Sequence, residues 1–144
     1  MPMCVTLGGT VTESVAPAER AILDTSVVIA DQVAPIPGVL AISAITVAEL
    51  NFGVLVAKTT EVRAERLRRL SLLQQRFDAL PVDEAVSVSY GRLAAAVVDA
   101  GRQPRHRVMD LLIAATAHAH GARLYTRNVR DFAGLEGLVD VIEV

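Results

Sequence analysis

The sequence lacks the residues on which several common enzyme chemistries depend. It has no tryptophan, only 3% aromatic residues and one cysteine, Cys4. A single cysteine can form no internal disulfide and no cysteine-based metal cluster. The motifs G-x-x-x-x-G-K-[ST], G-x-S-x-G and H-E-x-x-H are also missing. The sequence therefore gives no support for a P-loop nucleotide site, a serine hydrolase or a zinc protease.

Long apolar runs are missing as well. No run approaches the ~20 residues that cross a membrane, and residues 1–19 lack the basic start and apolar centre of a signal peptide. We therefore expect a cytoplasmic protein with no membrane segment. The 144 residues, 52% of them hydrophobic and 21% charged, fit one compact domain. We expect a loose N-terminal extension over residues 1–19 and a domain over residues 20–144.

Lysine is nearly absent: the chain has thirteen arginines but only Lys58, and its net charge is −2. The chain as a whole is thus no polycation for nucleic acid. Arginine binds phosphate in a forked geometry that lysine lacks, although genome composition could give the same bias. The arginines support a nucleic-acid partner only where they cluster.

Short apolar segments alternate with helical ones along the chain. This alternation predicts an α/β fold, a doubly wound parallel sheet flanked by helices. The helical excess between the second and third strands predicts a helical hairpin. The expected strands are residues 20–24, 39–43, 122–126 and 139–144. The expected helices start at Thr25, broken by Pro35–Gly38, and then cover residues 46–57, 60–77, 83–100 and the helix around 109–117.

The helix Met109–Ala117 is the segment around which the chain is organised. It is apolar on nearly every side, so we expect it to run through the middle of the fold. Asp110 nevertheless lies in its first turn. The helix dipole favours a carboxylate there, but a buried carboxylate still needs a partner, and a metal ion is one candidate.

Acidic residues follow the expected strands at the edge where α/β sheets bind ligands. They are Asp24, Glu49, Asp110 and Asp131, the last accompanied by Asn128. Clustered carboxylates repel one another unless a cation neutralises them, and hard divalent cations prefer oxygen ligands. Such an ion activates water and offsets charge at phosphorus. The acids therefore suggest phosphodiester hydrolysis.

Each acid also has a structural interpretation. Asp24 could cap the helix that follows it, as could Thr25 or Ser26. Glu49 could complete a capping box that begins at Thr46. Asp131 could be an ordinary turn acid. Asp110 is the strongest candidate, because its neighbours are apolar.

Four strings of the sequence resemble the PIN domain family and, within it, the VapC toxins of type II toxin–antitoxin systems. They occur in the family's order and spacing from about residue 20 to the C-terminus. The strings are Ile22–Ser26, Ser43–Leu50, Asp110–Ala115 and Thr126–Phe132.

The resemblance implies a PIN-like fold and a Mg²⁺- or Mn²⁺-dependent endoribonuclease. Asp24 and Asp110 would be the main metal ligands. Glu49 would bind the metal, directly or through water, or help to activate the attacking water. The fourth acid is ambiguous, and we favour Asp131 over the position of Asn128. The residues that would support the site are Ser26, Thr126 and Asn128.

The resemblance also implies partners. We expect a homodimer, a heterotetramer or larger assembly with a VapB-type antitoxin, and an RNA substrate. The charged segment Lys58–Arg76 is a plausible docking place for the antitoxin. Arg102, Arg105 and Arg107 could hold RNA phosphates, or could simply form a solvated basic loop.

Two other classes of function compete with the nuclease. A non-enzymatic module could bind a partner through the helical hairpin of the same fold. A response-regulator-like or phosphatase domain would place a lysine near a late strand, whereas the sole lysine here, Lys58, lies in a helical region. The nuclease interpretation accounts for more of the acids than either alternative.

Overall fold

Five parallel strands form the centre of the molecule in the computed structural model, which describes residues 19–144. Their order across the sheet is β3-β2-β1-β4-β5, and every pairing is parallel. The predicted doubly wound α/β fold is therefore confirmed. The elements in chain order are β1 (Arg20–Leu23), α1 (Thr25–Val28), β2 (Val39–Ser43), α2 (Ala44–Leu55), α3 (Thr60–Arg76), β3 (Ala79–Leu80), α4 (Glu84–Asp99), η1 (Pro104–Arg107), α5 (Val108–Ala119), β4 (Arg123–Thr126), η2 (Val129–Phe132) and β5 (Val141–Glu143).

The strand order reverses beside β1. From β1 the chain builds outward through β2 and β3, and it then returns to place β4 on the other side of β1. Connections at such a switch point leave in opposite directions, which opens a crevice at the carboxyl ends of the two strands. Leu23 and Tyr125 are paired at that edge. The residues that follow them, Asp24 and Thr126, therefore lie at the crevice.

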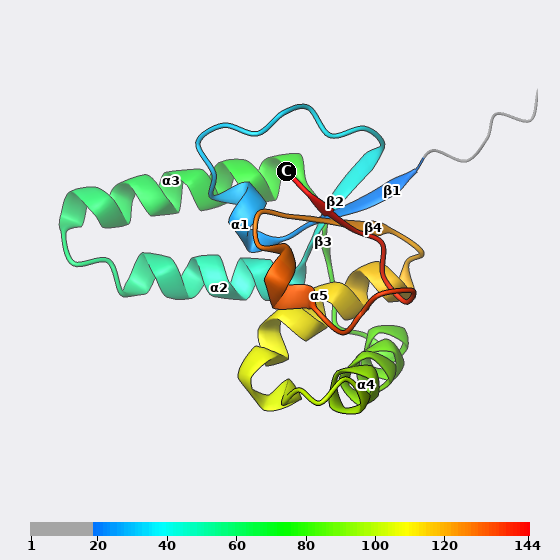
Figure 1. The fold of residues 1–144 in the computed structure, drawn as a ribbon. Coiled ribbons are helices and arrows are strands. Elements are labelled where there is room, and N and C mark those ends of the chain that lie inside the picture. The colour runs from blue at the N-terminus through cyan, green and yellow to red at the C-terminus, as the bar shows by residue number, and fades with distance from the viewer. Residues whose placement is uncertain (1–18) are drawn as a thin grey trace, which may run out of the picture.

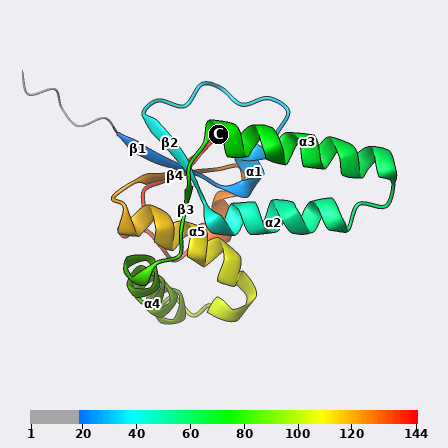
Figure 2. The same cartoon turned by 180° about the vertical axis from the view of Figure 1, so that it is seen from behind.

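Both faces of the sheet are buried, as successive residues of β1 illustrate. Ile22 packs into the core that α4 and α5 form with the sheet, whereas Ala21 and Leu23 pack on the opposite face beside Val27 and Tyr125. Figures 1 and 2 show α4 and α5 together on one side of the sheet. The prediction of a central helix is confirmed, because residues 113–117 of α5 are all buried.

Helices α2 and α3 form the predicted hairpin, which projects from the side of the sheet (Figures 1 and 2). Helix α2 begins earlier than the expected residue 46, because Ser43 caps it: the Ser43 Oγ atom accepts a hydrogen bond of 3.0 Å from the Ile45 amide. Glu49 therefore lies in the second turn, and the capping-box interpretation of Thr46 and Glu49 is wrong.

Two further sequence expectations need correction. Strand β3, at the edge of the sheet, was missing from the prediction, because two residues carry no periodicity. Helix α1 has only four residues and ends at Val28, well before Pro35, so Pro35–Gly38 does not terminate it. Gly38 instead lets the chain enter β2: it has φ +101°, and a Cβ atom there would clash with the Glu19 carbonyl oxygen.

Within residues 19–144, no helix is both long enough and apolar enough to cross a membrane. The expected N-terminal extension, residues 1–19, falls outside the described residues except for Glu19.

Candidate active site

Asp24 lies at the start of α1, but its side chain makes no capping hydrogen bond. Its Oδ2 atom instead accepts hydrogen bonds from the hydroxyls of Ser26, at 2.7 Å, and Thr126, at 2.9 Å. Only 5% of Asp24 is exposed. The capping interpretation of the Asp24 side chain is therefore wrong, and the carboxylate is held toward the end of β4.

Backbone amides orient the two hydroxyls that hold Asp24. The Ser26 Oγ atom accepts from the amide of Arg127 at 3.0 Å, and the Thr126 Oγ1 atom accepts from the amide of Asn128, also at 3.0 Å. Each hydroxyl has one proton, so both protons are available for the carboxylate. Asn128 thus supports the site through its backbone. This network fixes one Asp24 oxygen at the crevice.

Glu49 reaches the same crevice from α2. Its Oε1 atom accepts a hydrogen bond of 2.8 Å from the Thr25 hydroxyl, which also lies 3.0 Å from the Thr46 hydroxyl. Sequence reasoning missed this role of Thr25, which it treated only as a helix start. The only sign in the sequence that Thr25 belongs to the site was its position next to Asp24. Its contacts, Thr46 and Glu49, are distant in sequence.

Asp131 lies in η2 and is paired with a cation. The Arg107 Nη1 atom donates a hydrogen bond of 2.8 Å to Asp131 Oδ1. The two side chains are only 33% and 40% exposed, so solvent screens this ion pair incompletely. Of the three arginines predicted to hold RNA, Arg102 and Arg105 are exposed, and Arg107 is turned toward the acids.

Asp110 is the acid with the most perturbed protonation. Its pKa is raised to about 6, first by burial and further by the negative charges of Asp131, Asp24 and Glu49, whereas Arg107 opposes the increase. Within residues 19–144, no protein group donates a hydrogen bond or forms an ion pair with the Asp110 carboxylate. The structure thus brings the other three predicted acids within electrostatic reach of Asp110.

The chemistry of these donors suits a hard divalent cation. Four carboxylates converge at one edge of the sheet, and that of Asp110 is partly buried with no partner in the described part of the chain. Mg²⁺ and Mn²⁺ bind such oxygen ligands and commonly retain several waters. In the described part of the chain, no three acidic, histidine or cysteine side chains lie close enough to enclose an ion in this conformation. Any ion would therefore depend on water as well as on the acids.

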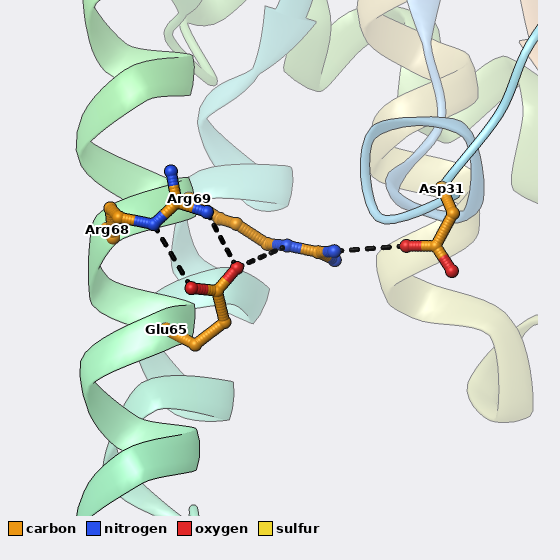
Figure 3. Close-up of polar contacts among 4 residues, drawn as sticks. All are labelled: Asp31, Glu65, Arg68 and Arg69. Atoms are coloured by element: carbon orange, nitrogen blue, oxygen red, sulfur yellow. Dashed lines mark hydrogen bonds and ion pairs between the residues drawn. The ribbon is translucent and has the colours of Figure 1, made fainter.

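A groove of about 450 Å³ leads away from Glu49 between α1, α2 and α3. Apolar side chains form most of its wall, and two arginines, Arg66 and Arg69, line the α3 side. Figure 3 shows that Arg69 reaches from α3 to Asp31 in the loop after α1, at 3.0 Å, and also contacts Glu65 at 3.3 Å. This ion pair connects α3 to the loop after α1, beside the groove.

Comparison with known proteins identifies the family. The sequence model of the PIN domain matches residues 21–137, a range that contains all four acids. The chain belongs to the PIN-domain family. This PIN domain is 39% identical over 126 residues to Ribonuclease VapC5 of Mycobacterium tuberculosis, covering 83% of this chain and 90% of that protein. It is also 40% identical over 100 residues to Ribonuclease VapC8 of the same species, covering 67% of this chain and 88% of that protein.

A solved structure agrees with this assignment. The crystal structure of VapBC-5 from Mycobacterium tuberculosis, a member of the VapBC family of toxin–antitoxin systems, superimposes with a TM-score of 0.75 at 38% identity. The match covers 87% of this chain and 97% of that one. Within the PIN-domain family, the chain therefore groups with the VapC proteins.

Proposed function

We propose that this PIN domain is a metal-dependent endoribonuclease toxin that hydrolyses RNA phosphodiester bonds and is neutralised by a cognate antitoxin. The observation that carries the proposal is the partly buried Asp110 carboxylate, which has no hydrogen-bond or ion-pair partner among residues 19–144 and feels the charges of three other acids at the switch point of the sheet. The similarity to proteins named VapC ribonucleases supports RNA as the substrate.

Asp24 and Asp110 would hold Mg²⁺ or Mn²⁺, with Glu49 as a direct or water-mediated ligand. When bound, the ion would offset charge on the scissile phosphate and acidify a coordinated water. Ser26 and Thr126 position Asp24 through its Oδ2 atom. Thr25 engages Oε1 of Glu49, so the other oxygen can accept a proton from the attacking water. Asp131 is the fourth acid, and Asn128 supports the β4 end of the site through its amide.

The groove beside Glu49 supports the expected antitoxin partner. A segment lying in it, against the Lys58–Arg76 part of the hairpin, would end next to Glu49 and cover the acids. The VapBC-5 relative comes from a toxin–antitoxin family, and we extend that pairing to this chain as a VapB-type antitoxin. We also propose a homodimer that forms a heterotetramer or larger assembly with the antitoxin.

The test is cleavage of total cellular RNA by the purified, antitoxin-free protein in Mg²⁺ or Mn²⁺. Asp110→Asn should reduce cleavage ~100-fold or more, because charge stabilisation by a metal is worth several kcal/mol. EDTA should abolish it. Asp99→Asn makes the same chemical change at an exposed position at the end of α4 and should cleave like the wild type.

The outcomes separate the two candidate functions. Equal cleavage by the wild type and Asp110→Asn would contradict the proposed site and point to a contaminating nuclease. If the folded, metal-supplemented protein cleaves no cellular RNA, the non-enzymatic binding module becomes the better interpretation, because, of the four acids, only Glu49 lines the groove and most of its wall is apolar.

A further inference from the structure

The acidic site already contains a cation of its own, the guanidinium of Arg107. Arg107 ends η1, immediately before α5, and its side chain donates to Asp131 Oδ1 at 2.8 Å. Its charge also opposes the mutual repulsion that acts on Asp110. The neighbouring Arg105, two residues earlier in η1, is exposed, and its side chain has no ion pair within residues 19–144. Arg107 is thus set apart from the other arginines of this segment.

The fixed positive charge of Arg107 changes how strongly the acids bind a metal cation. Four carboxylates at one edge destabilise each other, and a partly buried arginine offsets part of that repulsion. Oδ1 of Asp131 already accepts a hydrogen bond from the guanidinium of Arg107. A divalent ion held by Asp24 and Asp110 would therefore meet a fourth carboxylate whose charge Arg107 already offsets, and the acids would attract it less strongly.

We propose that Arg107 is a positioning residue that acts through Asp131: it is the resident counter-cation of the acidic site, and it weakens divalent-metal binding there. This inference rests on the proposed function. It differs from a role in RNA binding alone, because an arginine that only contacts phosphate would leave metal affinity in the absence of RNA unchanged.

The test measures Mn²⁺ affinity by calorimetric titration without RNA, at pH 8, where Asp110 is ionised. Arg107→Gln should lower the dissociation constant roughly tenfold, equivalent to about 1.4 kcal/mol. Arg105→Gln removes the same charge from the same segment and should change it less than about twofold. An unchanged or weakened affinity in Arg107→Gln would overturn the inference.

A double-mutant cycle separates the ion pair from the general field of the arginine. In an Asp131→Asn background, where the carboxylate partner is gone, Arg107→Gln should alter Mn²⁺ affinity less than about threefold. An equal effect in both backgrounds would show that Arg107 does not act through Asp131, and would overturn the inference.

Failure of this inference is distinguishable from failure of the proposed function. Wild-type protein that binds Mn²⁺ with an affinity unaffected by Arg107→Gln would overturn the role of Arg107 and leave the nuclease intact. Wild-type protein that produces no heat with Mn²⁺, and whose melting temperature Mn²⁺ does not raise, would overturn both the proposed metal site and this inference.

Discussion

At the scale of single residues, the charged form of Asp110 lowers the stability of the fold, although the proposed function needs it to bind metal. Its pKa of about 6, against an ordinary 3.8, means that the fold favours the neutral carboxyl group. Between these two values the folded chain binds more protons at this group than the unfolded chain does. The contribution of Asp110 to stability therefore falls as the pH rises through this window, and it stays unfavourable above it.

Asp110→Asn should consequently stabilise the metal-free protein although it reduces cleavage. In EDTA at pH 8, where the wild-type carboxylate is charged, we expect a melting temperature higher by roughly 2–4 °C, the change that ~1 kcal/mol gives a domain of this size. The gain should shrink toward pH 5, where wild-type Asp110 is largely protonated. Thermal melts at the two pH values check this; an asparagine variant that is less stable at pH 8 would contradict it.

The sequence indicated the acids of the candidate site but not the side chains that contact them. Asp24 and Asp131 could be found because they follow strands, and Asp110 because an acid at the head of an apolar helix is unusual. The contacts of Thr25 with Glu49 and of Arg107 with Asp131 could not be found. Each joins residues 24 positions apart, and it depends on rotamers and loop paths that no local pattern encodes.

At the scale of elements, α3 is a long helix with very little buried surface. It has 17 residues, and Leu70 is its one buried residue. Arg69 adds the ion pair with Asp31 and contacts with Glu65 (Figure 3), but these are exposed side chains in water. Leu70 is therefore the main buried contact of α3 with the rest of the domain.

Leu70→Ala should loosen α3 without unfolding the domain. Loss of a buried leucine typically costs about 2–5 kcal/mol, and here the loss falls on an element with few other buried contacts. Hydrogen exchange should accelerate in α3 and remain slow in α4 and α5. Arg69→Ala, one position earlier, should leave α3 exchange nearly unchanged. If exchange instead accelerates uniformly in Leu70→Ala, α3 unfolds only together with the core.

Element prediction succeeded where periodicity was long and failed where the elements were short. The α4 prediction differs from the observed helix by one residue at each end, because apolar residues recur there over four turns. Strand β3 and helix α1 have two and four residues, and their existence is decided by the neighbours they pack against. A pattern of two to four residues is too short to predict whether such an element forms.

At the scale of the whole molecule, the parallel sheet followed from the alternation of strands and helices. The strand order did not, because alternation is compatible with several orders. The general rule for α/β sheets predicted only that the acids after the strands would share one edge. The observed order places β1 and β4 side by side, so that their carboxyl ends meet there.

The proposed boundary of the domain leads to a last prediction. Glu19 and β1 are integral to the sheet, since Glu19 pairs with Arg123 at the start of β4 and its carbonyl accepts from the Val39 amide. A chain of residues 19–144 should therefore melt within about 2 °C of the full chain, a difference well under 1 kcal/mol, and should cleave RNA equally. A chain starting at Ile22 loses half of β1 and these contacts, and it should be strongly destabilised. Lost cleavage by folded 19–144 would mean that residues 1–18 belong to the site.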